Sequence, residues 1–169
     1  MAEVLLETRG LSKFFKTAGG LLHAVEDVDL ALGAGRTLGV VGESGCGKST
    51  LGRTVLRLEK PSAGQVLFRG EDISALGRRQ LRSARRDMQM VFQDPYSSLD
   101  PRMTVFDLVA EPLREICRGL PRAQAREHVL DTMELCGLPA EYADSYPHEL
   151  DGGRRQRVGL ARAMVTEPK

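Results

Sequence analysis

The sequence predicts an α/β fold in which a strand-rich first part is followed by a helical second part. The prediction depends on short apolar segments early in the chain, a glycine-rich turn between an apolar run and a helix, and a helical period of apolar residues from Thr104 onward. At 169 residues the chain is long enough for one domain with a hydrophobic core. It shows neither an internal repeat nor a low-complexity segment.

The strand-rich part is defined by apolar segments that are separated by turn residues. The expected strands lie at residues 4–6, 25–32, 38–41, 64–68 and 88–92. Leu38, Val40 and Val41 make the third segment a candidate for a buried strand. Glycines follow it at once, and residues 49–58 then predict a helix.

The helical part begins at Thr104, where the apolar residues take a helical spacing. They are Val105, Leu108, Val109, Leu113 and Ile116. Thr104 suits the N-cap position because its hydroxyl can accept a hydrogen bond from a free backbone N–H group. Pro112 is expected to kink this helix.

Two more helices are expected further along the chain. One runs from about Pro121, a residue suited to a first helical turn, to Cys136, with Gly137 as its C-cap. The other opens near Asp151. Residues expected on or near its buried side are Val158, Leu160, Ala161 and Met164.

The charge balance of the chain argues against nucleic acid or anionic lipid as a partner. Lys plus Arg number 24 and Asp plus Glu number 23, a net charge of +1, so there is no global field to attract a polyanion. Two basic runs interrupt the balance: Arg78, Arg79, Arg82, Arg85 and Arg86, and then Arg154, Arg155, Arg157 and Arg162. A solvated helix face explains such runs more often than a polyanion site does.

The cysteines point to a reducing compartment. Cys46, Cys117 and Cys136 are widely spaced and form no Cys-x-x-Cys pair, so neither a disulfide framework nor a zinc site is expected. The chain begins without a basic leader, and no apolar stretch approaches the length that spans a bilayer. A role at a membrane would therefore depend on partner subunits.

The most specific motif matches the phosphate-binding pattern G-x-x-x-x-G-K-[ST], known as Walker A. It reads Gly42-Glu43-Ser44-Gly45-Cys46-Gly47-Lys48-Ser49. Glycines let the backbone curl so that its N–H groups point at a phosphate, and the following helix directs its positive end there. Lys48 is expected to reach the β- and γ-phosphates, and Ser49 to ligate Mg²⁺. A glycine-rich surface loop is the alternative, but the apolar run before the motif and the helix after it argue against that.

Two later segments narrow the class of phosphate-binding protein. They read Val91-Phe92-Gln93-Asp94-Pro95 and Leu150-Asp151-Gly152-Gly153-Arg154-Arg155-Gln156-Arg157-Val158. Each is weak alone, since one glutamine is usually an exposed loop residue and an aspartate before two glycines is a good helix cap. In this order after Walker A, they resemble the ATP-binding subunits of ABC transporters over essentially the whole chain.

Similarity to the dipeptide and oligopeptide importer branch of that family rests on three stretches. They are residues 42–53, Phe92-Gln93-Asp94-Pro95-Tyr96-Ser97-Ser98-Leu99-Asp100-Pro101-Arg102, and Tyr146-Pro147-His148-Glu149-Leu150. The resemblance implies a P-loop NTPase core of the ABC ATPase type with an N-terminal antiparallel β portion and a helical signature subdomain. Residues 1–95 would hold Walker A and the Q-loop, and residues 96–169 the signature segment. The C-terminal part of the family's domain is expected to be missing.

The resemblance also assigns roles to residues, with ATP and Mg²⁺ as cofactors. Gln93 would be the Q-loop residue, which touches Mg²⁺ or the attacking water and acts in catalysis with Lys48. Phe15 stands where the family stacks an aromatic side chain on adenine, and Phe14 is the alternative. For either residue, packing in the core is nearly as common a role as adenine stacking. His148 precedes the signature and is not the family's switch histidine. Residues expected to bind nucleotide are Gly42, Glu43, Ser44, Gly45, Cys46, Gly47, Lys48, Ser49, Thr50 and Phe15.

The family's partners follow from the same resemblance. ATP binding and hydrolysis would drive peptide import, together with a second ATP-binding subunit, identical or different, transmembrane permease subunits and an extracytoplasmic peptide-binding protein. No nucleic acid is expected. The protein would be peripheral, at the cytoplasmic face of the inner membrane. The signature segment, Leu150, Asp151, Gly152, Gly153 and Arg154, would face the ATP of the partner subunit.

Two departures from the family set limits on this interpretation. The family signature reads Leu-Ser-Gly-Gly-Gln, and here Asp151 and Arg154 stand at the Ser and Gln positions. An ionised aspartate cannot donate a hydrogen bond and repels a phosphate, unless Arg154 turns in to offset its charge. Residues 167–169 also precede the apolar strand that supplies the family's Walker B Asp and catalytic Glu. We therefore expect this chain alone to bind nucleotide without hydrolysing it.

The alternatives come from other classes of function. A degenerate, non-catalytic nucleotide-binding module is favoured by the altered signature and the missing strand. A soluble ABC ATPase of DNA repair or translation would normally carry a long insertion or a second cassette, and neither is visible in the sequence.

Overall fold

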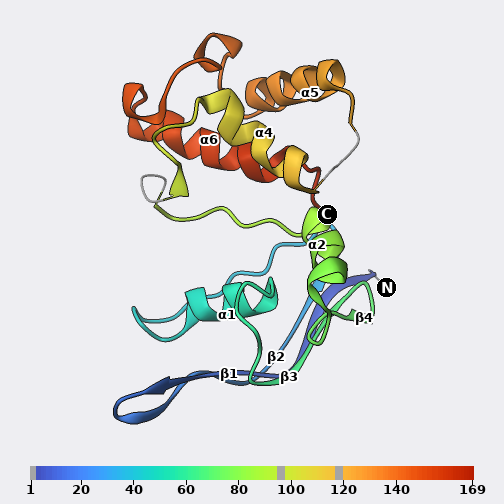
Figure 1. Ribbon diagram of the computed structural model, residues 1–169. Helices are drawn as coiled ribbons and strands as arrows, with labels where there is room; N and C mark the ends of the chain where they lie inside the picture. Colours follow the sequence, from blue (N-terminus) through green and yellow to red (C-terminus); the bar gives the residue numbers. More distant parts are fainter. Residues whose placement is uncertain (1–2, 95–97, 117–119) are drawn as a thin grey trace. The chain divides into compact units, whose positions relative to one another are not determined.

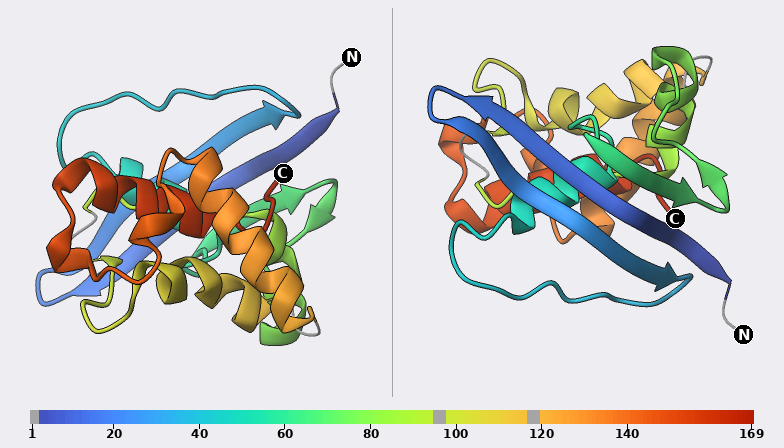
Figure 2. Two further views of the ribbon diagram at one scale, coloured as in Figure 1. Left: turned by 90° about the horizontal axis from the view of Figure 1, so that it is seen from above. Right: turned by 90° about the horizontal axis from the view of Figure 1, so that it is seen from below.

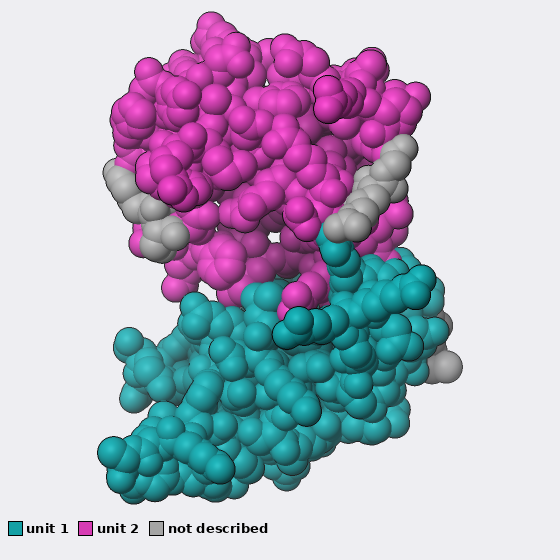
Figure 3. All heavy atoms as spheres, viewed as in Figure 1, with its two compact units in different colours: residues 1–84 teal, residues 85–169 magenta. Residues whose placement is uncertain are grey.

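The computed structural model describes residues 3–94, 98–116 and 120–169 and forms two compact units (Figure 1). The first unit comprises residues Met1–Ala84 and the second Arg85–Lys169 (Figure 3). The functional division expected near residue 95 stays a prediction. Cys117 and the Pro95-Tyr96-Ser97 part of the glutamine motif lie outside the described residues.

The first unit is built on a 4-stranded antiparallel sheet with the order β2-β1-β3-β4. Its strands are β1 (Val4–Thr17), β2 (Gly20–Gly33), β3 (Ala63–Phe68) and β4 (Glu71–Asp72). The first two form a long hairpin that runs the length of the sheet (Figure 2). This sheet confirms the antiparallel β portion, and the strands expected at residues 4–6, 25–32 and 64–68 lie within β1, β2 and β3.

Two strands that the sequence predicts are not formed. Residues 36–43 and 88–92 are neither helix nor strand. The buried strand expected at residues 38–41 is instead open, with 97% of the Val41 side chain exposed. In the described residues neither segment pairs with a strand, and a strand needs such a neighbour to satisfy its backbone N–H and C=O groups. Apolar period alone therefore overestimated the number of strands.

Helices α1 and α2 complete this part of the chain. Helix α1 (Lys48–Val55) buries Thr54 and Val55, and it ends three residues before the predicted limit at Leu58. Helix α2 (Arg78–Asp87) contains the first basic run and buries none of its residues. Most of its residues are exposed, as expected of a solvated helix face, and Leu81, Ala84, Arg85 and Asp87 are half-buried.

The second unit consists of packed helices, with α4 (Val105–Ile116), α5 (Arg122–Leu135) and α6 (Gly152–Met164) as the longest (Figure 1). Short 3₁₀ turns η1 (Ala140–Tyr142) and η2 (Pro147–Glu149) lie between α5 and α6. Thr104 caps α4 as predicted, since its hydroxyl accepts a hydrogen bond from the Asp107 N–H at 3.2 Å. The helix continues through Pro112.

The end of α5 is where the sequence places it. Gly137 has a φ of +70°, a left-handed conformation that favours glycine. Its N–H donates to the Glu134 carbonyl at 2.9 Å, and the Leu138 N–H donates to the Met133 carbonyl at 2.9 Å. This pair of bonds is the Schellman motif, which satisfies carbonyls at a helix C-terminus.

The core of the second unit joins the three helices. Its fully buried members include Val109, Val129, Met133, Val158 and Val165. Leu160 and Met164, expected on or near the buried side of α6, are not core residues, because they are 39% and 36% exposed. Packing on α4 and α5 selects the face through Val158 and Ala161, and it leaves the neighbouring apolar positions at the edge.

Candidate nucleotide-binding site

The Walker A residues form a loop that opens onto the N-terminus of α1. Gly47 is the N-cap residue of this helix and has a φ of +94°. A Cβ atom at Gly47 would lie 2.1 Å from the Ala24 carbonyl oxygen of β2, so the loop approaches the sheet too closely for any side chain. A Cβ atom at Gly42 would lie 2.7 Å from the Cys46 sulfur. A side chain at Gly47 would therefore collide with β2, and one at Gly42 would collide with Cys46.

Lys48 lies across this loop. Its ammonium donates to the carbonyl of Gly42 at 2.8 Å and to the carbonyl of Glu43, and it lies 3.5 Å from the Cys46 sulfur. Both carbonyls are neutral acceptors. A phosphate in the loop would offer charged oxygens instead, and charge-assisted bonds are roughly twice as strong. The position of Lys48 thus fits a phosphate ligand.

The first turn of α1 supplies the remaining donors. The first N–H groups of a helix have no intrahelical acceptor, and they carry the positive end of the helix dipole. Here they belong to Lys48, Ser49 and Thr50, and Leu51 is the first residue whose N–H closes a helical bond, to Gly47 at 2.8 Å. The Ser49 side chain makes no hydrogen bond to any residue that the structure describes, so its hydroxyl is available to Mg²⁺. These groups fit a nucleotide phosphate with its metal ion.

The two aromatic candidates for adenine both lie on β1 and are half-buried. The ring of Phe15 carries the Lys13 ammonium 4.8 Å from its centre. The ring of Phe14 lies 4.2 Å from that of His23, with an interplanar angle of 33°. Each aromatic thus has a partner within the hairpin, and adenine stacking stays a prediction.

Gln93 lies in an exposed segment of the second unit that is neither helix nor strand. The structure brings the Walker A residues together within the first unit and the signature residues together within the second. The predicted approach of Gln93 to the phosphate loop concerns both units and stays a prediction.

The signature segment forms the N-terminus of α6. Leu150 is buried at 3% exposure, and Asp151 is the N-cap residue. One carboxylate oxygen of Asp151 accepts from the Arg154 N–H at 2.7 Å, and the other accepts from the Arg154 guanidinium at 2.7 Å. The Arg154 backbone bond, together with the guanidinium charge, lowers the pKa of Asp151 below its ordinary value. The structure therefore shows both features that the sequence suggested, the helix cap by Asp151 and the turn of Arg154 toward it.

Tyr142 belongs to this site but carries no signal in the sequence. Its ring lies under the Arg154 guanidinium, with 4.7 Å between the guanidinium carbon and the ring centre. Twelve positions separate the two residues, and only the turn through η1 and η2 brings them together. Neither the spacing nor the composition of residues 140–154 indicates the contact.

The second basic run is not simply a solvated face. Arg155 donates to the Pro147 carbonyl at 2.6 Å, and Arg157 donates to the Gly137 carbonyl at 2.7 Å. Arg162 donates to the Ser98 carbonyl at 2.9 Å and pairs with Glu111 at 2.6 Å. These arginines tie α6 to the loops and the helix around it.

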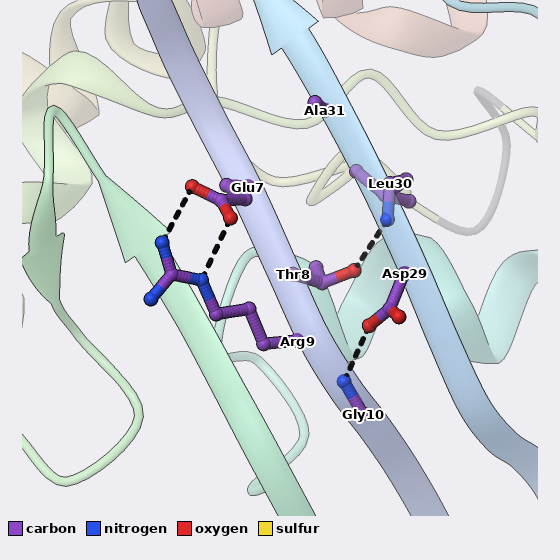
Figure 4. Close-up of a pocket in the computed structure, with 7 residues that line it drawn as sticks. All are labelled: Glu7, Thr8, Arg9, Gly10, Asp29, Leu30 and Ala31. Carbon is purple, nitrogen blue, oxygen red and sulfur yellow. Dashed lines mark hydrogen bonds and ion pairs between the residues drawn. The ribbon is translucent and has the colours of Figure 1, made fainter.

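A shallow pocket on the sheet of the first unit has a structural explanation (Figure 4). It follows an irregularity in the pairing of β1 with β2. The Thr8 hydroxyl accepts from the Leu30 N–H at 3.1 Å, and Asp29 accepts from the Gly10 N–H at 2.6 Å. The side chains replace ladder bonds that the shifted register cannot make. We assign no ligand to this pocket.

Comparisons with known proteins agree with this geometry. A family model described as ABC transporter matches residues 25–169. The oligopeptide transport ATP-binding protein OppF of Bacillus subtilis is 46% identical over 100% of this chain and 56% of its own length. The probable peptide ABC transporter ATP-binding protein y4tS of Sinorhizobium fredii is 47% identical over 99% of this chain and 49% of its own length. The chain thus spans about half the length of the curated relatives it matches.

A solved structure supports the same assignment. The dimeric bacterial ABC transporter cassette MJ0796 has a TM-score of 0.88 at 30% identity, over 97% of this chain and 71% of that one. The structural match and the Walker A sequence together place the chain in the P-loop class of nucleotide-binding proteins. The matches go further, and the chain belongs to the ABC transporter ATP-binding family. In the part of the chain that the structure describes, no helix is long and apolar enough to cross a membrane.

Proposed function

We propose that the protein is the ATP-binding subunit of an ABC importer and couples ATP binding and hydrolysis to the uptake of dipeptides or oligopeptides. The observation that carries the proposal is the Walker A loop, with the Lys48 ammonium inside it and the free N-terminus of α1 beside it. The 46% identity to an oligopeptide transport protein supports peptides as the transported class.

In this function the Walker A loop holds the phosphates of ATP. Lys48 contacts the β- and γ-phosphates, and Ser49 ligates Mg²⁺ with Gln93 as a second ligand. Phe15 stacks on adenine. Gln93 acts in catalysis and transmits the state of the nucleotide to the membrane subunits. The division of labour assigns the nucleotide core to residues 1–95 and the signature subdomain to residues 96–169.

The function requires partners. A second ATP-binding subunit places its ATP against residues 150–154, and transmembrane permease subunits use the closure of the pair to move peptide. An extracytoplasmic peptide-binding protein delivers the cargo. The protein then works at the cytoplasmic face of the inner membrane without crossing it, and without nucleic acid. The solved relatives support pairing, since MJ0796 is described as a dimeric cassette.

Uptake of radiolabelled peptide tests this function in cells that carry the full-length protein and its permease. Lys48→Ala should reduce uptake to the level of cells that lack the protein. Lys60→Ala, which removes an exposed lysine of the same unit that lies outside the Walker A motif, should leave uptake unchanged. Uptake of peptide that does not depend on Lys48 would refute the proposal, whereas Lys48-dependent uptake of another solute would change only the cargo.

A non-catalytic nucleotide-binding role is the second candidate for the 169-residue chain by itself. The ion pair between Asp151 and Arg154 within the signature segment favours it. The chain should release no more phosphate from ATP than its Lys48→Ala variant. Lys48-dependent turnover in a homogeneous preparation would refute the non-catalytic role.

A further inference from the structure

The N-terminus of α6 already holds an anion, which is the carboxylate of Asp151. Both carboxylate oxygens are engaged by Arg154, one by its backbone N–H and one by its guanidinium, each at 2.7 Å. The backbone N–H of Gly153 also favours the ionised form and contributes to the lowered pKa of Asp151. A helix N-terminus and a guanidinium are groups that bind phosphate. In this chain they bind a side chain of the same helix.

The direction of Arg154 is set by more than this ion pair. Its guanidinium rests on the ring of Tyr142 at 4.7 Å, a distance within the range of cation–π attraction. Arg155 and Arg157 are held by the backbone carbonyls of Pro147 and Gly137. In the second basic run, Arg154 is therefore the arginine whose charge is held at the helix N-terminus.

We propose that Asp151 is a built-in occupant of the anion site at the N-terminus of α6 and competes there with the nucleotide phosphate of a second subunit. This inference rests on the proposed function, in which residues 150–154 face that phosphate. In the unpaired subunit the Asp151 carboxylate then occupies the anion site. The Arg154 guanidinium, which could otherwise bind the phosphate, is paired with that carboxylate. Association driven by ATP should depend on the charge at position 151 and on whether Arg154 is free.

A pure helix cap gives a different expectation. Asparagine and serine cap a helix about as well as aspartate, so Asp151→Asn and Asp151→Ser keep the capping bond and remove the charge. If Asp151 only caps α6, both variants should behave like the wild type. If Asp151 competes with phosphate, both should associate more tightly.

Variants at Arg154 distinguish this competition from simple repulsion between Asp151 and the phosphate. Asp151→Ser alone removes the carboxylate acceptor of Arg154 and leaves the guanidinium, still beside Tyr142, available to the phosphate. Its gain should therefore exceed that of Asp151→Ser combined with Arg154→Gln. Arg154→Gln alone leaves the carboxylate uncompensated and should associate more weakly than the wild type. A double-mutant cycle over these proteins measures the coupling between the two side chains.

The experiment is light scattering of the full-length protein with a non-hydrolysable ATP analogue, alongside a separate titration of nucleotide into the monomer. Asp151→Asn and Asp151→Ser should associate about tenfold more tightly than the wild type at low salt, and the gain should shrink at high salt because exposed charges are screened. Asp144→Asn makes the same change of charge at an exposed neighbouring position and should have no effect.

Three results decide the matter. Association of Asp151→Asn equal to that of the wild type, with nucleotide affinity intact, would overturn the proposal and leave Asp151 as a cap. A double variant equal to Asp151→Ser would overturn the role of Arg154. If neither the wild type nor any variant binds nucleotide, the proposed function itself is contradicted. That result is distinct from failure of the competition proposal, in which nucleotide still binds. Hydrogen exchange at the first turn of α6 checks that each variant keeps the helix.

Discussion

Gly47→Ala tests whether the Walker A loop lies against β2 as closely as the structure shows. The new methyl group would stand 2.1 Å from the Ala24 carbonyl oxygen, and the residue would need to hold a φ of +94°. An L-residue in a left-handed conformation costs about 1–2 kcal/mol, and overlap with a neighbouring group costs about 1–3 kcal/mol more. We therefore expect the loop to shift, and the free energy of unfolding of the chain to fall by about 2–5 kcal/mol.

Gly52→Ala is the matched control. Gly52 lies within the same helix, and a Cβ atom there meets nothing within 4 Å. Alanine is the better helix former, so this variant should gain about 0.5–1 kcal/mol. Urea unfolding followed by circular dichroism measures both changes, and an ATP titration reports the state of the loop. If Gly47→Ala unfolds at the same urea concentration as the wild type and binds ATP equally well, the close approach to β2 is wrong.

Three further predictions concern the second unit. Leu108→Ala removes a side chain that is 1% exposed in the helical core and should lower the free energy of unfolding by about 2–5 kcal/mol, as measured by urea unfolding; a loss below 1 kcal/mol would contradict the packing of α4. Thr104→Ala should cost about 1 kcal/mol because it removes the cap bond to Asp107, while Thr104→Ser should retain most of it. Hydrogen bonds from the Arg102 side chain and N–H lower the pKa of Asp100 to about 2, so its contribution to stability is complete above about pH 4 and is lost as the pH falls towards 2. A carboxyl-carbon NMR titration should show this midpoint, and Arg102→Ala should raise it; an unchanged midpoint would contradict the ion pair.

The parts of the fold that depend on local signals could be predicted from the sequence. Thr104, Pro121 and Gly137 mark helix limits through their own backbone preferences, and the structure begins or ends α4 and α5 within two residues of these positions. The apolar segments around Val25 and Val66 became strands because each has a neighbour that completes its hydrogen bonds.

The parts that depend on distant partners could not be predicted in this way. Residues 38–41 and 88–92 have the apolar character of strands, but no described strand pairs with them. Leu160 and Met164 have the character of core residues and lie at the edge of α6, because burial depends on which face meets α4 and α5. The Walker A residues are contiguous, so they could be named from their spacing. The contact of Arg154 with Tyr142 joins two separate segments, so it could be found only in the structure.

The central claim is that Lys48 holds the phosphates of a nucleotide. Equilibrium titration of the chain with ATP and Mg²⁺ tests it most directly, with Lys48→Ala as the variant and Lys60→Ala as the control. Loss of a charge-assisted contact of roughly 1.5–3 kcal/mol predicts a dissociation constant about 10- to 100-fold higher for Lys48→Ala. The control should bind as the wild type does. Equal affinity of Lys48→Ala and the wild type would contradict the assignment of the loop.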